Sequence, residues 1–76
     1  MTTLDITFFY GAPPGEADAR AFDQIRRVYG IRDLRLDEQR RAIEVEYDAS
    51  RLNESDIAAL LAEAGFELRH MVRAAI

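Results

Sequence analysis

The side chains that are missing limit the chemistry of this chain more than those that are present. The 76 residues include no cysteine, which excludes disulfides, thiolate metal ligands and cysteine nucleophiles together. The sequence has one histidine, His70, and two acids, Glu16 and Asp18, that follow the loop Gly11-Ala-Pro-Pro-Gly15. Imidazole and carboxylate groups bind transition-metal ions when several of them converge. These three residues are therefore the candidate metal ligands.

Two features count against a metal site built from these residues. Glu16 and Asp18 are two positions apart, so they point in different directions if this segment is helical. If the last strand alternates from Phe66 through Leu68, His70 faces the core at the end of that strand away from the loop. Two solvated acids at a helix start and a partly buried histidine explain the same residues without a metal. We predict no metal cofactor, and the alternative is a transition-metal ion bound by non-cysteine ligands.

The sequence also lacks a residue pattern suited to catalysis or to anion binding. The serines and threonines have no candidate base beside them, because His70 is the only imidazole. Backbone N–H groups at a helix start can hold an anion, but Pro13 and Pro14 lack these groups and the two nearby acids repel anions. We predict that the chain is not an enzyme.

The charges are distributed unevenly along the chain. The net charge is −4, and arginine supplies all of the strong bases. Residues 20–41 hold seven arginines against four acids, whereas residues 42–67 hold one arginine against seven acids. An acidic domain is not expected to bind nucleic acid. The arginine-rich half is suited to an acidic partner, or else it belongs to a mixed, solvated surface.

The start of the chain and its length predict a compartment and a domain count. Met1-Thr-Thr-Leu-Asp5 lacks the basic and apolar regions of a signal peptide, and no run approaches the ~18 apolar residues of a membrane span. We predict a cytoplasmic protein with no direct membrane insertion and a single domain over residues 1–76. Met1 suggests a complete N-terminus, whereas the end at Ile76 leaves open a domain excised from a longer chain.

Hydrophobic periodicity predicts four strands and two helices. The expected elements are a strand at 4–10, a helix at 16–29, strands at 31–37 and 42–47, a helix capped by Asn53 and ended by Gly65, and a strand at 66–72. The order βαββαβ predicts an α+β, ferredoxin-like fold, with a four-stranded antiparallel sheet and two helices on one face. Many functions share this fold, so it does not identify one.

The side-chain pattern of each element predicts which residues enter the core. The first helix carries an apolar stripe that ends at Tyr29, and Gly30 is expected to end that helix in the left-handed conformation. The predicted core comprises Leu4, Ile6, Phe8, Phe22, Ile25, Val28, Leu34, Leu36, Ile43, Val45, Tyr47, Ile57, Leu60, Leu61, Phe66 and Leu68.

Two local features specify the second half of the chain. The strands at 31–37 and 42–47 must place their apolar residues on one face, which determines their register. The expected cross-strand pairs are Leu36 with Ile43, Leu34 with Val45, and Arg35 with Glu44 on the open face. Asn53 and Asp56, three residues apart, predict a capping box at the start of the second helix.

Several segments resemble, in order and spacing, the heavy-metal-associated domain family of copper chaperones, periplasmic mercury-binding proteins and N-terminal modules of metal-pumping P-type ATPases. They are Tyr29-Gly-Ile31, Leu34-x-Leu-Asp37, Ile43-Glu-Val-Glu-Tyr-Asp48, Ser55-Asp-Ile57 and Glu63-Ala-Gly-Phe66, and the resemblance covers nearly the whole chain. The family places a core residue at the position of Phe9, whereas alternation from Leu4 favours Phe8. The sequence therefore leaves open which of the two faces the core.

The resemblance also implies where a metal loop would lie. The family motif is glycine-methionine-x-cysteine-x-x-cysteine, and its glycine is commonly nineteen positions from the glycine that ends the first helix. Gly11 and Gly30 have the same separation. This gapless alignment puts Ala12 at the methionine, and Pro14 and Ala17 at the two cysteines. Neither residue offers a side-chain ligand, so the family's metal binding is not carried over to any residue.

The resemblance implies a role in metal-ion transport that is exerted through protein contacts. We predict a protein-interaction or regulatory domain whose partner is a metal-transporting P-type ATPase or its other domains. The residues expected to dock a partner are Phe9, Pro13, Pro14, Arg20, Gln24 and Arg27. The alternative is a heavy-metal-binding domain that uses carboxylates and His70, with ligands shared across a homodimer. A third hypothesis is a self-association module unrelated to metals.

Overall fold

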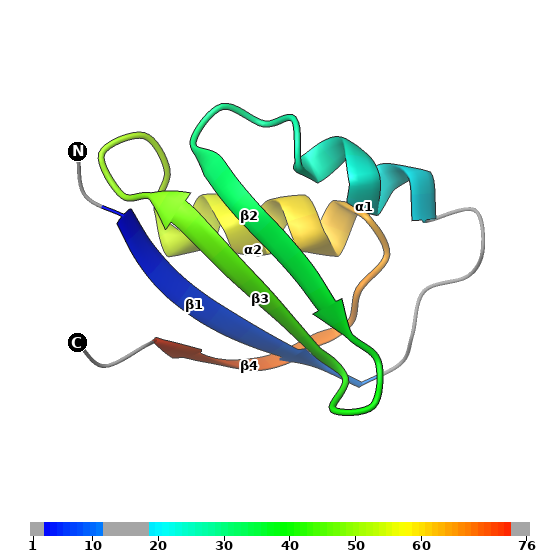
Figure 1. Ribbon diagram of the computed structural model, residues 1–76. Helices are drawn as coiled ribbons and strands as arrows, with labels where there is room; N and C mark the ends of the chain where they lie inside the picture. The colour runs from blue at the N-terminus through cyan, green and yellow to red at the C-terminus, as the bar shows by residue number, and fades with distance from the viewer. Residues whose placement is uncertain (1–2, 12–18, 74–76) are drawn as a thin grey trace.

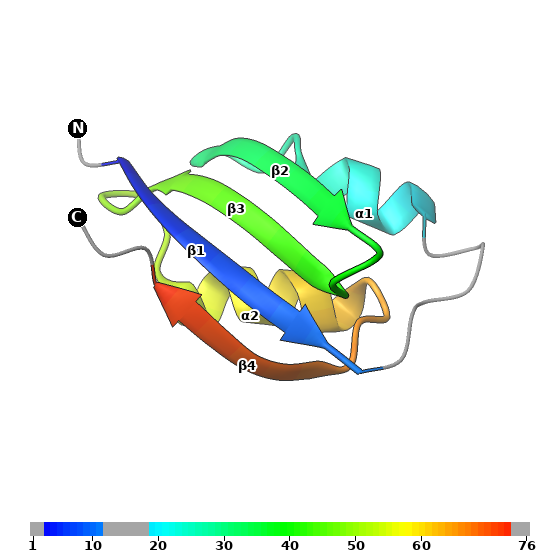
Figure 2. The ribbon, with the colours of Figure 1, turned by 60° about the horizontal axis from the view of Figure 1, so that its bottom comes forward.

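Six elements alternate in the order βαββαβ in the computed structural model, which describes residues 3–11 and 19–73 (Figure 1). The elements are β1 (Thr3–Tyr10), α1 (Ala19–Ile25), β2 (Ile31–Asp37), β3 (Ala42–Asp48), α2 (Glu54–Glu63) and β4 (Leu68–Arg73). The strands form one antiparallel sheet in the order β2-β3-β1-β4. Both helices lie on the same face of this sheet (Figures 1 and 2). The predicted ferredoxin-like fold is confirmed.

The central strand β1 decides which aromatic residue enters the core. Ile6 and Phe8 are 1% and 2% exposed, and they pack among the buried side chains beneath the helices. Because side chains alternate along a strand, Phe9 lies on the open face of the sheet. The structure therefore places Phe8 in the core, as the alternation favoured, and not Phe9.

The hairpin of β2 and β3 has the predicted register. Leu36 pairs with Ile43 and Leu34 with Val45, while Arg35 lies opposite Glu44. The guanidinium Nη2 of Arg35 is 3.2 Å from Glu44 Oε2, and both groups are partly exposed. Such a pair contributes about 0.2–1 kcal/mol. Its main effect is to favour this register over a one-residue slip, which would turn the apolar side chains outward.

Helix α2 begins and ends as the sequence indicates. Asn53 Oδ1 accepts a hydrogen bond from the Asp56 amide at 2.8 Å, and Asp56 Oδ2 accepts one from the Asn53 amide at 3.1 Å, which completes the capping box. Ile57 and Leu61 are fully buried against the sheet. Gly65 follows the helix with φ of 98°, the left-handed region that favours glycine.

Helix α1 is shorter than predicted at its C-terminal end, because it ends at Ile25. The amides of the next three residues, Arg26 to Val28, donate to carbonyls three positions earlier, at 3.0–3.2 Å. These tighter turns rotate successive side chains by more than an α-helix does. Tyr29 consequently leaves the apolar stripe and is 73% exposed. Gly30, with φ of 106°, leads into β2 and does not end the helix.

Two further predictions are wrong, and they concern the edge strands β4 and β2. The last strand begins at Leu68, two residues later than predicted, and β1 and β4 change register between Phe9 and Tyr10. Tyr10 pairs with Leu68 and Phe9 with His70, so the side-chain alternation of β4 is interrupted between these two pairs. Leu36, predicted for the core, lies on the edge strand β2 and is 37% exposed.

The packing of α2 gives a stability prediction. Leu61→Ala should lower the free energy of unfolding by about 2–5 kcal/mol, because it removes a side chain that is 0% exposed. Leu60→Ala is the matched control, since Leu60 is only partly buried and its loss should cost clearly less. Urea denaturation followed by circular dichroism measures both values. Equal losses would contradict the observed orientation of the helix.

Candidate functional site

The loop that would carry a metal site starts from a fixed end of β1. The amide of Gly11 donates to the Glu67 carbonyl at 2.9 Å, and the Gly11 carbonyl accepts from Arg41 Nη1 at 2.6 Å. Arg41 has φ of 51°, and its carbonyl accepts from the Tyr10 amide at 3.0 Å. The β2–β3 turn and the residue just before β4 therefore hold the chain where the loop begins.

Most of the residues predicted for this loop lie outside the described residues. They are the candidate metal ligands Glu16 and Asp18, the positions aligned with the family cysteines, Pro14 and Ala17, and the candidate docking residue Pro13. Their assignment remains a prediction from the sequence.

His70 is described, and it does not face the core. The change of register in β4 turns it to the open face of the sheet, where it is exposed and pairs with Phe9. The two rings stack with centroids 4.6 Å apart and an angle of 18° between their planes. The Arg40 guanidinium lies 5.9 Å from the Phe9 ring centroid. The predicted core position of His70 is thus wrong, because the alternation from Phe66 does not continue through the irregularity.

The described acids do not gather around this imidazole. Within residues 3–11 and 19–73, no three histidine or acidic side chains lie close enough together to hold a metal ion. The arginine that lies over Phe9 holds two acids on this face, since Asp37 and Glu44 are each 3.8 Å from Arg40. These described residues therefore supply no convergent ligand set for a hard or a soft cation.

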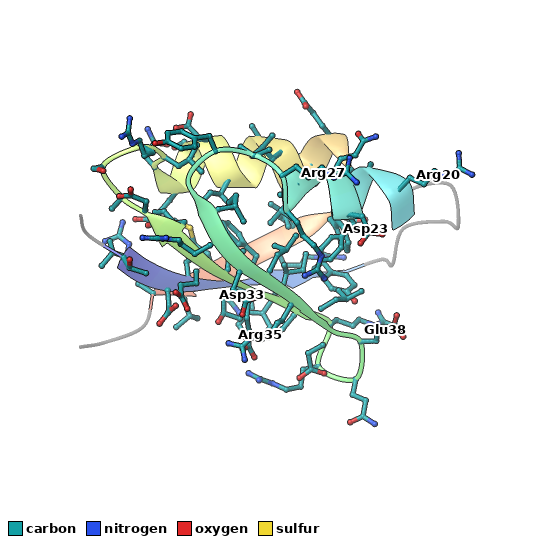
Figure 3. The ribbon with its side chains drawn as sticks, turned by 45° about the horizontal axis from the view of Figure 1, so that its top comes forward. Arg20, Asp23, Arg27, Asp33, Arg35 and Glu38 are labelled. Carbon is teal, nitrogen blue, oxygen red and sulfur yellow. The ribbon has the colours of Figure 1, made fainter. Side chains whose placement is uncertain are left out.

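The four described docking candidates are divided between two sides of the molecule. Arg20 and Gln24 lie exposed on α1 and Arg27 lies in the turn that follows it, whereas Phe9 lies on the open face of the sheet. Figure 3 shows Arg20 and Arg27 beside the helices, and Arg35 on the opposite side of the sheet. One partner surface can include the three residues of the helical layer, and Phe9 belongs to a separate surface.

Among the residues that the structure describes, two hollows are relevant to binding. A groove of about 350 Å³ lies between the helices, where Gln24 and Ile25 face Leu60 and Glu63. A second hollow, of about 360 Å³, lies where the turns after α1 meet the end of β3. Its charged and aromatic lining comprises Arg26, Arg27, Tyr29, Arg32, Asp48 and Arg51, and we call it the arginine hollow. The sequence signalled it only through the excess of arginine in residues 20–41.

Asp48 is the one acid of the arginine hollow, and it is held inside its own turn. It is 7% exposed, and its Oδ1 accepts hydrogen bonds from the Ser50 hydroxyl at 2.6 Å and the Ser50 amide at 3.0 Å. These bonds lower the pKa of Asp48 from its ordinary value, and the nearby charges of Arg51 and Arg32 add to that effect. Asp48 is therefore ionised at neutral pH.

Comparisons with known proteins identify relatives of the fold only. No protein-family model matches this sequence, and no curated protein matches it. Among solved structures, the N-terminal domain of a potential copper-translocating P-type ATPase from Bacillus subtilis, in its Cu(I)-loaded state, is similar with a TM-score of 0.74. It is 17% identical, over 90% of this chain and 86% of that one. Oxidized MerP from Ralstonia metallidurans CH34 gives the same score and identity, over 90% and 96% of the two chains.

The turn at Asp48 predicts how stability depends on pH. Because the pKa of Asp48 is lower in the folded protein, its contribution is present above the unfolded pKa of about 3.9 and is lost as the pH falls through the folded value. Ser50→Ala should raise the folded pKa and reduce the change in unfolding free energy between about pH 6 and pH 2. Ser55→Ala, at an exposed position in α2, is the control. An unchanged pH dependence in Ser50→Ala would contradict the assignment.

Proposed function

We propose that this chain is a module of the heavy-metal-associated type that has lost thiolate metal binding and acts as a protein-interaction or regulatory domain in metal-ion transport. The observation that carries the proposal is a chain without cysteine in the fold of a domain solved with Cu(I) bound. Cu(I) selects thiolate and thioether ligands. Of the two methionines, Met71 lies on β4 opposite Phe8 and not opposite the start of the loop at Gly11, and Met1 is outside the described residues.

The arrangement of the described side chains supports an interaction role better than a metal-carrying role. A metal carrier needs ligands that converge, whereas the described histidine stacks on Phe9 and the nearby acids pair with Arg40. The exposed residues Arg20, Gln24 and Arg27 along the helical layer suit a protein contact. On this proposal the partner is a metal-transporting P-type ATPase or one of its other domains, and the chain works in the cytoplasm. Within the described residues, no helix has the length and apolar character needed to cross a membrane.

The alternative function, metal binding through other ligands, has one observation in its favour. His70 is exposed on the open face of the sheet, so a second copy of the chain is able to bring an acid to it. Such a site would bind Zn²⁺ or Ni²⁺ rather than Cu(I), because imidazole and carboxylate ligands suit those ions. Its affinity would fall on dilution, since the ligands come from two chains.

A titration with Cu(I), Zn²⁺ and Ni²⁺ against competing chelators tests the proposal. We expect no ion to bind with a Kd below about 1 μM, and no amide of residues 11–18 or of His70 to shift in ¹⁵N–¹H NMR spectra. Tight binding of any ion with shifts at these positions would overturn the proposed loss of metal binding. The residues that shift would then be the replacement ligands.

A variant of the same loop provides the matched control. If the alignment with the family motif is correct, Pro14→Cys with Ala17→Cys restores the two thiolates and should bind Cu(I) at least about 100-fold more tightly than the parent chain. Pro14→Cys alone supplies one thiolate and should recover only a small part of that gain. Equal binding by the single and double variants would show that these positions do not form the pair that the alignment implies.

A further inference from the structure

The arginine hollow brings together two segments that are separate in the sequence, residues 26–32 and the turn that holds Asp48 and Arg51. Arg26 and Arg27 come from the turns after α1, Arg32 from the start of β2, and Arg51 from the turn that precedes α2. The amide of Asp48 donates to the Gly30 carbonyl at 2.7 Å and joins the end of β3 to the segment that enters β2. The two segments that line the hollow are thus joined to each other by a backbone hydrogen bond.

The charge of this hollow has the opposite sign to that of the chain. Four guanidinium groups and one carboxylate line it, whereas the whole chain carries a net charge of −4. The carboxylate of Asp48 is almost buried and accepts two hydrogen bonds from Ser50. Arg26 has an exposed ion pair with Asp23 at 3.6 Å, which is weak in water. The structure gives Arg27 no carboxylate partner among the residues it describes. A positive field therefore faces solvent at this end of the molecule.

Tyr29 lies beside these charges and is not part of the hydrophobic core. Tyr29 is 73% exposed, and the Arg51 guanidinium lies 4.7 Å from the centroid of its ring. A large exposed aromatic side chain loses contact with water only when a partner covers it. Tyrosine and arginine are also the residue types that most often dominate the energy of protein interfaces. The pair of Tyr29 and Arg51 therefore has the character of an interface anchor.

The shape of the hollow favours a peptide over a small molecule. Pockets for small ligands enclose roughly 70–90% of the ligand surface. Here the arginines and Tyr29 are themselves exposed, so an occupant is covered on one side only. A chain segment that crosses the hollow gains from several ion pairs at once, and arginine binds carboxylates through two parallel hydrogen bonds. An enclosed small molecule is not what this arrangement suits.

We propose that the arginine hollow is a docking site for an acidic, extended segment of a partner protein, whose carboxylates pair with Arg27 and Arg51 while Tyr29 covers the chain beside them. The proposal rests on the proposed interaction function and names the chemistry of the partner. Its failure is separable from a failure of that function, because the metal titration involves none of these residues. Binding through several exposed ion pairs should be fast and should weaken as salt is added.

Fluorescence anisotropy with a fluorescein-labelled oligoglutamate peptide tests the site. Arg27→Glu and Arg51→Glu should each weaken binding at low salt by about tenfold or more. Arg69→Glu is the matched control, because it changes the net charge by the same amount at an exposed position on β4, outside the hollow and outside the surface formed by Arg20, Gln24 and Arg27. It should weaken binding by less than about threefold. Tyr29→Ala should weaken binding without changing the dependence on salt.

Three outcomes would overturn the proposal. Equal weakening in Arg69→Glu and Arg27→Glu would mean that the peptide responds to net charge alone. Binding of inorganic diphosphate that depends on Arg27, with no binding of the peptide, would make the hollow a site for small anions. Binding of neither probe would leave it an ordinary surface. ¹⁵N–¹H spectra confirm that each variant is folded, and Arg27→Glu decides the question if Arg51→Glu unfolds the chain, because Arg27 lies exposed in its turn.

Discussion

The register of β1 between its two neighbours determines where every other group of interest lies. β1 pairs with β3 over most of its length and with β4 up to the irregularity at Phe9 and Tyr10. The first pairing sends Ile6 and Phe8 into the core. The second sends His70 to the opposite face, where it stacks on Phe9. The sheet thus separates the two helices from the face that carries the imidazole.

Features that depend on neighbouring residues were predictable from the sequence. The capping box at Asn53 is confirmed, because it depends on hydrogen bonds between residues three positions apart. The pairing of Arg35 with Glu44 is also confirmed, because both strands must place their apolar residues on one face and this determines the register. Features that depend on distant segments were not predictable. The irregularity in β4 follows from its pairing with β1, and it reversed the expected orientation of His70. The early end of α1 and the exposure of Tyr29 likewise follow from how the chain enters β2.

In the candidate site, too, some features were predictable from the sequence and others depended on the fold. The absence of cysteine excluded thiolate binding at once, and the structure adds that the described acids pair with arginines rather than gather around the histidine. The arginine hollow escaped prediction because Arg51 comes from the acidic half of the sequence, and the fold brings it beside Tyr29 through contacts such as the bond between Asp48 and Gly30. The composition predicted a positively charged segment. Only the structure showed that its arginines line a hollow beside the exposed Tyr29.

The most direct test of this account is the environment of the His70 ring in solution, measured by nuclear Overhauser effects to its two carbon-bound protons. The account predicts contacts with the Phe9 ring and an upfield shift that disappears in Phe9→Leu, because the stacked ring shields these protons. Contacts with core residues such as Phe66 or Ile57 would contradict it. They would mean that β4 runs without the irregularity, that the histidine faces the helical layer, and that a metal site near the loop must be considered again.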